Sequence, residues 1–143
     1  MYKILLADDE GIVIESLKIL IEKELGSNCE IRYAKTGRSV IELAETFRPD
    51  IAFMDIQMPG INGIEAMKEI RKANSSIIFI VMTAYDKFDY AREAINLKVL
   101  DYLNKPADKE KILDVLNRAI SIIDEERRKR SEDLLIREKM ETV

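Results

Sequence analysis

Carboxylate, hydroxyl and ammonium side chains follow short apolar runs in this sequence. Asp8 and Asp9 come directly after the run ILLA, and Asp55 comes directly after IAFM. Two later apolar runs are followed by Thr83 and, one residue further on, by Lys105. A carboxylate nucleophile, a hydroxyl donor and a mobile ammonium group are suited to phosphoryl transfer. A single polar residue at such a place can simply begin a loop, but the whole set favours a site.

The carboxylates also predict a metal. If the runs before Asp8 and Asp55 form neighbouring strands, three carboxylates converge, and a cation would relieve their repulsion. An all-oxygen site suits magnesium, which binds one or two carboxylates together with phosphate oxygens. The chain contains no histidine, which excludes a Ser–His or Cys–His catalytic pair and a His zinc site within it. Its one cysteine, Cys29, is expected to be a small buried hydrophobe.

Short apolar runs alternate with longer stretches of helical period. The runs predict strands over residues 2–7, 29–34, 51–54, 77–82 and 99–103. Between them apolar residues recur at helical spacing, as at Phe88, Ala91 and Ile95, and a final helix begins near Asp108. The alternation predicts a parallel sheet between two layers of helices, with ligands bound beyond the carboxyl ends of the strands.

The totals are typical of a single globular domain. The chain has 143 residues, of which 47% are hydrophobic and 35% charged. A formal net charge of −4 gives no electrostatic reason for the chain itself to bind nucleic acid. No apolar run approaches the roughly 20 residues of a membrane span, and the start of the chain is too short and acidic for a signal peptide. With no paired cysteines, these features predict a soluble protein of cytoplasmic location and no membrane partner.

Four segments resemble the bacterial two-component response-regulator receiver family, namely LLADDE, FMDIQMPGINGIE, FIVMTAYD and DYLNKPA. The likeness extends over nearly all of residues 2–123 and keeps the family's order and approximate spacing. It implies an α/β fold of flavodoxin-like type, doubly wound, with five parallel strands in the order 2-1-3-4-5. The strand order comes from the resemblance, because the spacing of the runs gives only the alternation.

By this resemblance Asp55 is the phosphoryl acceptor and lies at a magnesium site. Asp9 matches the carboxylate that ligates the metal directly, and Asp8 matches its neighbour, which reaches the metal through water. Gln57, two residues beyond Asp55, would lend its backbone carbonyl to the ion.

The resemblance also implies a switch. Thr83 and Lys105 match the hydroxyl and ammonium groups that hold the phosphoryl oxygens, and Tyr102 matches the switch aromatic of the last strand. A half-buried core tyrosine is an alternative explanation of Tyr102. The bond between Lys105 and Pro106 resembles one that is often cis in the family, an arrangement that would aim the lysine inward.

The implied function is that of a phosphorylation-controlled receiver. A sensor histidine kinase would donate the phosphoryl group, and the surface of the fourth helix, fifth strand and fifth helix would then change and bind a partner or a second copy as a homodimer. The chain would catalyse only its own phosphorylation and slow dephosphorylation, so it is a switch rather than a turnover enzyme.

An output domain is expected outside these residues. The run AYDKFDYAREAI resembles receivers fused to an arabinose-regulator-type helix-turn-helix domain, and no such domain is present in this sequence. DNA would then be bound, and transcription controlled, only through that domain. A stand-alone receiver that acts through protein contacts is the alternative.

Two other functions compete on the same topology. A phosphohydrolase of the haloacid-dehalogenase type needs a second aspartate two residues after the nucleophile, where this chain has Gln57. A flavodoxin-like cofactor binder needs a Gly- or Ser/Thr-rich phosphate loop after the first strand. In that place Asp8, Asp9 and Glu10 would repel a phosphate. Both alternatives are therefore weaker than the receiver.

The end of the chain is predicted to be a helical extension or a linker over residues 124–143, after a receiver domain over residues 1–123. The segment from Asp124 to Arg137 contains no Pro or Gly. We therefore expect the last helix to extend past the domain and to remain helical to about residue 135.

Charges in this extension have opposite signs at a spacing of four residues. The expected ion pairs are Asp124 with Arg128, Glu125 with Lys129 and Glu126 with Arg130. A solvated helix and a coiled-coil linker both remain open, because arginines interrupt the apolar spacing that a coiled coil requires.

Overall fold

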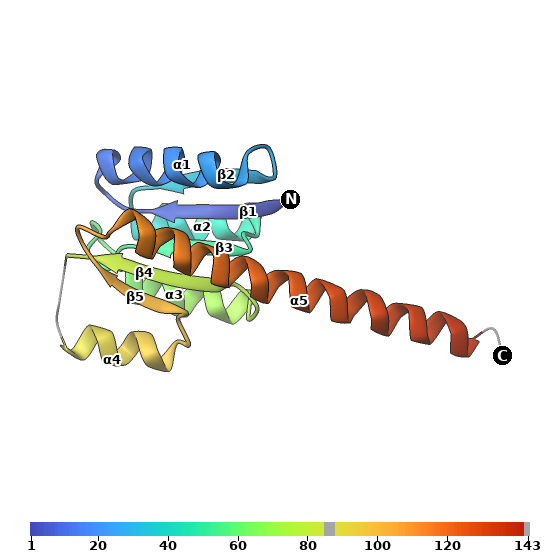
Figure 1. Ribbon diagram of the computed structural model, residues 1–143. Helices are drawn as coiled ribbons and strands as arrows, with labels where there is room; N and C mark the ends of the chain where they lie inside the picture. Colours follow the sequence, from blue (N-terminus) through green and yellow to red (C-terminus); the bar gives the residue numbers. More distant parts are fainter. Residues whose placement is uncertain (85–87, 142–143) are drawn as a thin grey trace.

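Strands and helices alternate along the chain within residues 1–84 and 88–141, which the computed structural model describes (Figure 1). The strands are β1 (Tyr2–Ala7), β2 (Cys29–Ala34), β3 (Ile51–Met54), β4 (Ile78–Thr83) and β5 (Asp101–Asn104). The helices are α1 (Gly11–Leu25), α2 (Gly37–Phe47), α3 (Gly63–Ala73), α4 (Phe88–Asn96) and α5 (Lys109–Glu141). The first three strands lie at their predicted bounds, whereas β4 and β5 begin slightly later than predicted.

The strands form one parallel sheet in the order β2-β1-β3-β4-β5, which confirms the predicted fold. β1 lies between β2 and β3, and its last residue, Ala7, is in register with Ala34 and with Met54. The chain therefore leaves β1 and β3 side by side at the same edge of the sheet. We call this edge, beyond the carboxyl ends of the strands, the carboxyl edge.

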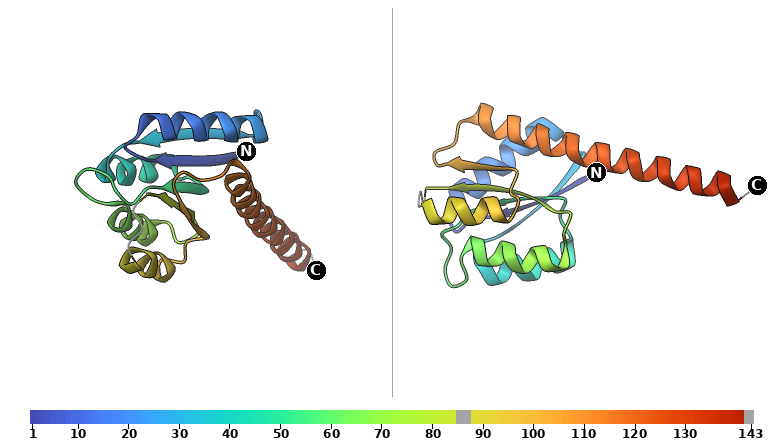
Figure 2. Two further views of the ribbon diagram at one scale, coloured as in Figure 1. Left: turned by 60° about the vertical axis from the view of Figure 1, so that its left-hand side comes forward. Right: turned by 90° about the horizontal axis from the view of Figure 1, so that it is seen from below.

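Helices cover both faces of the sheet (Figure 2). α1 and α5 pack on one face, and α2, α3 and α4 pack on the other. The side chains of β3 alternate between the two cores: Ile51 and Phe53 join the side of α1 and α5, while Ala52 and Met54 join the opposite side. All four are buried, which explains why the sequence of this central strand is an unbroken apolar run.

The buried face of α4 differs from the predicted one. Ile95, predicted to face the core, is 74% exposed, and the side chain of Phe88 on the same predicted face lies outside the described residues. Ala94 is fully buried instead, with Tyr90 and Leu97 packed against the same core. Tyr90, Ala94 and Leu97 also recur at helical spacing, so periodicity alone could not choose between the two apolar stripes.

α5 continues well beyond the body of the domain (Figure 1). It ends at Glu141 rather than near residue 135, and its 33 residues span about 50 Å at about 1.5 Å per residue. Its last buried residue is Ile123. Within the residues that the structure describes, neither α5 nor any other helix combines the length and hydropathy needed to cross a membrane.

Two residues beyond position 123 hold α5 to the edge of the sheet opposite the carboxyl edge. The Tyr2 hydroxyl donates to Asp124 Oδ1 at 2.5 Å, and this hydrogen bond raises the pKa of Tyr2. The Arg127 guanidinium lies 3.3 Å from Asp50 Oδ2 and 5.2 Å from the centroid of the Tyr2 ring. Asp50 also accepts the backbone N–H of Lys3 at 2.8 Å. We call Tyr2, Asp50, Asp124 and Arg127 the α5 clasp, because they fix the direction in which α5 leaves the domain.

The ion pairs along the extension also differ from the prediction. Arg128 pairs with Glu125 and Glu132, each at 2.5 Å, rather than with Asp124, which binds Tyr2. These pairs join exposed side chains of a single helix. Each therefore stabilises α5 only weakly, because water screens the charges.

We expect Arg127→Gln to lower the free energy of unfolding by about 1 kcal/mol, because it removes the ion pair with Asp50 and the contact with the Tyr2 ring. Arg128→Gln is the control: it makes the same change of charge one residue further along α5 and should cost less, because the ion pairs that it removes join exposed side chains within one helix. Urea denaturation followed by circular dichroism measures both values. Equal losses in the two variants would contradict a stabilising role for the clasp.

Candidate functional site

Backbone hydrogen bonds place three polar residues at the carboxyl edge. The N–H of Asp55 donates to the carbonyl of the last residue of β1 at 2.8 Å. The N–H of Asp8 donates to the last residue of β2 at 3.2 Å, and that of Lys105 to the last residue of β4 at 2.9 Å. The hydrogen-bond ladder therefore continues one residue past β1, β3 and β5, and it brings together side chains that are far apart in the sequence.

Four carboxylates meet at this edge. One carboxylate oxygen from each of Asp8, Asp9, Glu10 and Asp55 lies within 4.8 Å of the others. Asp8 and Asp55 are buried, at 3% and 4% exposed, whereas Asp9 and Glu10 are exposed. The sequence reasoning includes the three aspartates but does not count Glu10 as a member of the site. Its position directly after Asp8 and Asp9 could have indicated that it belongs to the site, although an exposed glutamate is also common before a helix without any such role.

The Lys105 ammonium group lies between three of these carboxylates. Its Nζ is 2.7 Å from Asp8 Oδ2, 2.8 Å from Glu10 Oε2 and 2.9 Å from Asp55 Oδ2. Lys105 donates hydrogen bonds to Glu10 and to Asp55, and it forms an ion pair with Asp8. Burial alone would lower the pKa of Lys105, but the three carboxylates outweigh burial and raise the pKa above its ordinary value. The peptide bond between Lys105 and Pro106 is cis.

The two buried carboxylates are held in different ways. Burial raises the pKa of Asp8, and the hydrogen bonds that Asp8 accepts from Lys105 and from the backbone N–H of Glu10 offset this only in part. Asp55 accepts from Lys105 through Oδ2 at 2.9 Å and from the backbone N–H of Gln57 through Oδ1 at 3.2 Å. Both oxygens of Asp55 thus face fixed donors, which orient its carboxylate.

The loop after Asp55 depends on a close approach of two backbone segments at Gly63. The Gly63 N–H donates to the carbonyl of Ile56 at 2.7 Å, and a Cβ atom at Gly63 would lie only 2.0 Å from the carbonyl oxygen of Asp55. Only glycine fits without moving the backbone of Asp55. α3 begins at this point, where the side chain of Asn62 accepts the N–H of Glu65 at 2.9 Å and caps the helix.

The two remaining residues of the predicted switch lie on β4 and β5. Thr83 is fully buried at the end of β4, in register with Asn104. Tyr102 is half-buried and packs against the core on the side of α2, α3 and α4. In this state the tyrosine ring therefore contributes to packing, in agreement with the alternative explanation of that residue.

The side chains at the carboxyl edge fit a hard divalent cation. Four carboxylates gather at this edge and three of them contact the single ammonium group of Lys105, so negative charge is in excess, and the candidate ligand atoms are all oxygen. Magnesium prefers such ligands. The structure brings the predicted ligands Asp8, Asp9 and Asp55 together, and Gln57, whose backbone carbonyl is the fourth predicted ligand, adjoins Asp55 through its own N–H.

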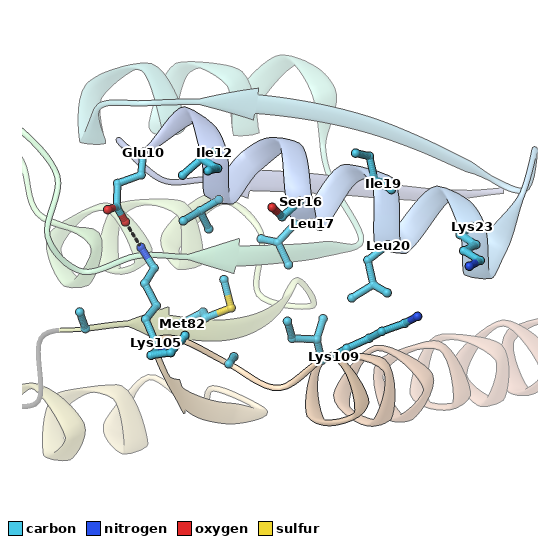
Figure 3. Close-up of a pocket in the computed structure, with 15 residues that line it drawn as sticks. Glu10, Ile12, Ser16, Leu17, Ile19, Leu20, Lys23, Met82, Lys105 and Lys109 are labelled. Carbon is cyan, nitrogen blue, oxygen red and sulfur yellow. Dashed lines mark hydrogen bonds and ion pairs between the residues drawn. The ribbon is translucent and has the colours of Figure 1, made fainter.

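An apolar groove adjoins the carboxylates (Figure 3). It encloses about 800 Å³ between α1 and the first residues of α5, with Glu10 and Lys105 at one end. Ile12 and Ile19 of α1 line it and are 77% and 60% exposed. Exposed apolar side chains around a groove are typical of a surface that binds a partner. The sequence does not reveal this groove, because the extra apolar residues of α1 have the spacing of ordinary core positions.

Comparison with known families identifies the class of protein that this fold and acidic edge define. Residues 4–117 match the family model described as the response regulator receiver domain. The match covers most of the chain, so the chain belongs to the response regulator receiver family, whose members are phosphoacceptor switches rather than enzymes in the ordinary sense. The resemblance predicted from the sequence is thereby confirmed.

Relatives of known sequence are transcriptional regulators. The chain is 36% identical over 121 residues to the uncharacterized transcriptional regulatory protein YesN of Bacillus subtilis, an alignment that covers 85% of this chain and 33% of YesN. It is 32% identical over 120 residues to the transcriptional regulatory protein HptR of Staphylococcus aureus, with coverage of 84% and 47%. The chain thus spans between a third and a half of the length of these relatives.

Solved structures agree with the fold. The REC domain of AraT, a response regulator from Geobacillus stearothermophilus, is 38% identical with a TM-score of 0.80, and the alignment covers 88% of this chain and 98% of that one. A CheY-like receiver domain protein from Methanospirillum hungatei, at 22% identity, has a TM-score of 0.82 with the same coverage and shows the likeness of fold alone.

The raised pKa of Asp8 leads to a prediction for stability. A carboxyl group whose pKa is raised by folding stabilises the protein at low pH, and this contribution is lost as the pH rises through the folded pKa. At neutral pH the ionised Asp8 therefore costs stability, and Asp8→Asn should raise the free energy of unfolding by about 1 kcal/mol without added metal. The gain should shrink as the pH falls below 5.

Urea denaturation at several pH values measures this difference between the parent and Asp8→Asn. Glu15→Gln, which removes one exposed carboxylate of α1, controls for the general change in charge. Added magnesium should stabilise the parent more than Asp8→Asn, since it binds the folded state through the carboxylates. A loss of stability in Asp8→Asn at neutral pH would contradict this account of the cluster.

Proposed function

We propose that this chain is a magnesium-dependent phosphoacceptor, in which Asp55 receives a phosphoryl group from a sensor histidine kinase and thereby switches a signalling surface. The observation that carries the proposal is the convergence of Asp8, Asp9 and Asp55 on one edge of the sheet, with the Lys105 ammonium 2.9 Å from Asp55 Oδ2. A carboxylate nucleophile held beside a cation is the arrangement that attack on a phosphoryl group requires.

In the transfer, an oxygen of Asp55 forms a bond to phosphorus as the bond between phosphorus and the donor's imidazole nitrogen breaks, and the electron pair leaves with the imidazole. The backbone N–H of Gln57 and the ammonium of Lys105 orient the attacking carboxylate. Asp9, Asp55 and the Gln57 carbonyl would hold a magnesium ion, which Asp8 would reach through water, and the bound ion would supply positive charge for the phosphoryl oxygens.

Turnover is expected to be slow. A phosphatase that forms an aspartyl phosphate needs an acid two residues after the nucleophile, and Gln57 cannot act as one. The chain is therefore proposed to catalyse its own phosphorylation and slow dephosphorylation only.

The switch is proposed to act through Thr83 and Tyr102. The buried hydroxyl of Thr83, the last residue of β4, would donate to a phosphoryl oxygen on Asp55. The loop after β4, which is expected to follow it, includes residues 85–87 outside the described part of the chain. Tyr102 on the neighbouring strand would then turn inward. The surface of α4, β5 and α5 would change in consequence and bind a partner or a second copy.

Contacts at the far end of α4 limit where that change occurs. Lys68 of α3 pairs with Glu93 at 3.0 Å, and Arg71 of α3 donates to the carbonyl of Leu97 at 3.1 Å. These contacts hold the carboxyl-terminal end of α4 against α3. We therefore expect the change to occur mainly in the amino-terminal part of α4, which follows β4 in the sequence.

Two observations support proposals for the phosphoryl donor and for the output, namely the apolar groove and the greater length of the relatives. The apolar groove beside Lys105 supports a protein donor, since a docked protein would present its phosphoryl group at the adjoining carboxylates. The relatives are transcriptional regulators two to three times as long as this chain. We propose that residues 1–123 are the receiver and that residues 124–143 form a helical linker to an output domain, which would make any contact with DNA; a receiver that acts through protein contacts alone is the second candidate.

We expect Asp55 to be the single site of phosphorylation. Incubation with acetyl phosphate and magnesium should add the mass of one phosphoryl group to the parent, and intact-protein mass spectrometry should find no such gain in Asp55→Asn. Asp50→Asn, which alters an aspartate of the α5 clasp, is the matched control and should be labelled like the parent. Labelling of Asp55→Asn, or labelling of the parent in the presence of a chelator, would refute the assignment.

We expect Thr83→Ala to accept the phosphoryl group but to lose the response of the surface, because no hydroxyl would remain to bind the phosphoryl oxygens. Hydrogen exchange over residues 88–106, with and without phosphorylation, measures that response. Thr46→Ala, an exposed threonine of α2, should respond like the parent. A normal change in protection in Thr83→Ala would count against the mechanism.

A further inference from the structure

Glu10 is the member of the carboxylate cluster to which the proposed function gives no role. Its Oε2 lies 2.8 Å from Lys105 Nζ, and its side chain is 56% exposed, whereas the side chains of Asp8 and Asp55 are 4% and 5% exposed. Glu10 is thus the outermost carboxylate of the three that bind Lys105. It stands where the site meets the apolar groove (Figure 3).

Three carboxylates surround Lys105 Nζ, so a phosphoryl oxygen cannot reach it without displacing one of them. Lys105 donates hydrogen bonds to Glu10 and to Asp55, and Asp8 Oδ2 lies 2.7 Å away as an ion pair. Before Lys105 can bind an incoming phosphoryl oxygen, at least one of these contacts must break. The contact with Glu10 costs least to break, because an exposed ion pair is worth less than a buried one and water can solvate the released carboxylate.

We propose that Glu10 is a specificity-determining residue that slows phosphorylation of Asp55 by small anionic donors. Its carboxylate repels an anion that approaches the site, and it occupies the N–H of Lys105 that the phosphoryl oxygen needs. This inference rests on the proposed function of Asp55. It concerns the choice of donor, not the ability of Asp55 to be phosphorylated.

The phosphoryl transfer that Glu10 slows needs no reactant besides Asp55 and the donor. With acetyl phosphate as donor, an Asp55 oxygen forms a bond to phosphorus, the bond from phosphorus to the acetyl oxygen breaks, and acetate leaves with the electron pair. No proton is transferred. The negative charge of the donor is therefore present throughout the approach, and Glu10 acts on that charge.

The size of the effect follows from Coulomb's law. An oxygen of Glu10 lies within 4.8 Å of an Asp55 oxygen, so a phosphorus atom in contact with Asp55 would be about 6 Å from Glu10. At that distance in water, removal of one negative charge speeds the approach of a dianion by about tenfold and that of a monoanion by about threefold. The effect should be screened by salt, since the Debye length falls to about 3 Å at 1 M.

A protein donor is less affected by the same charge. A partner seated in the groove beside Ile12 and Ile19 gains binding energy from apolar contacts that a small anion lacks. Glu10 therefore selects against free acyl phosphates while the route for a docked protein stays open.

The test compares Glu10→Gln with Glu15→Gln, which removes an exposed carboxylate one turn further along α1. Rates of phosphorylation of Asp55 are measured by mass spectrometry with acetyl phosphate and with phosphoramidate, which carries less negative charge. Magnesium is held at saturation for each variant, as established by calorimetric titration. Binding of acetylphosphonate, an unreactive analogue of acetyl phosphate, is measured by NMR as a readout that does not depend on the reaction.

We expect Glu10→Gln to be labelled about tenfold faster than the parent by acetyl phosphate and about threefold faster by phosphoramidate, and to bind acetylphosphonate more tightly. Glu15→Gln should stay within about twofold of the parent, and the gain of Glu10→Gln should largely disappear at about 1 M potassium chloride. Unchanged or slower labelling of Glu10→Gln, or an equal gain in Glu15→Gln, would overturn the inference about Glu10. The proposed function would still stand in that case, provided that the parent is labelled on Asp55. A parent that gains no phosphoryl group on Asp55 would overturn both.

Discussion

The Lys105 ammonium group lies between carboxylates that come from two strand ends and from the start of α1, and the rest of the site depends on this contact. Asp8 and Asp55 are buried, and two ionised carboxylates in such a place repel each other and lose hydration unless a cation compensates them. Lys105 reaches them from β5, which β4 separates from β3. The strand order and the short loop after β5 are therefore what allow the carboxylates to be buried at all.

The two edges of the sheet have different tasks. At the carboxyl edge, carboxylates outnumber the ammonium group beside them, and the proposed switch would exchange their partners. At the opposite edge the α5 clasp joins Tyr2 and Asp50 to Asp124 and Arg127. These contacts fix the direction of α5 relative to the sheet. β1 and β3 connect the two, because each begins near the clasp and ends at a carboxylate of the site. The proposed change at Asp55 would thus occur on the same strands that orient the extended helix.

Much of the fold follows from the sequence because burial on both faces of a parallel sheet gives unbroken apolar runs, as in β3. The start of β5 is less predictable: Leu100 is apolar and its N–H bonds to Phe79, yet the strand begins one residue later. α4 carries two apolar stripes, and only tertiary packing selects Ala94 over Ile95. The start of β5 and the buried face of α4 depend on contacts between distant segments, which local periodicity does not indicate.

The sequence indicates the site residues that follow directly after the strands, but it does not indicate Glu10, which lies further along the chain. Asp8 and Asp55 stand out because each directly follows an apolar run, and Lys105 follows such a run after one residue. Glu10 does not stand out, because its role arises only from the position of an ammonium group 95 residues away. The hydrogen bond between Tyr2 and Asp124 spans 122 residues for the same reason. Long-range electrostatic partners are the part of this molecule that required the structure.

The most direct test of this account is a crystal structure of the protein with magnesium and beryllofluoride, which mimics a phosphoryl group on Asp55. We expect beryllofluoride to bind Asp55, Asp9 and Asp55 to ligate the metal, and Lys105 Nζ to leave Glu10 and bind a fluoride. If Lys105 instead keeps all three of its carboxylate partners, with beryllofluoride bound away from Asp55, the exchange of partners at the centre of the account is wrong.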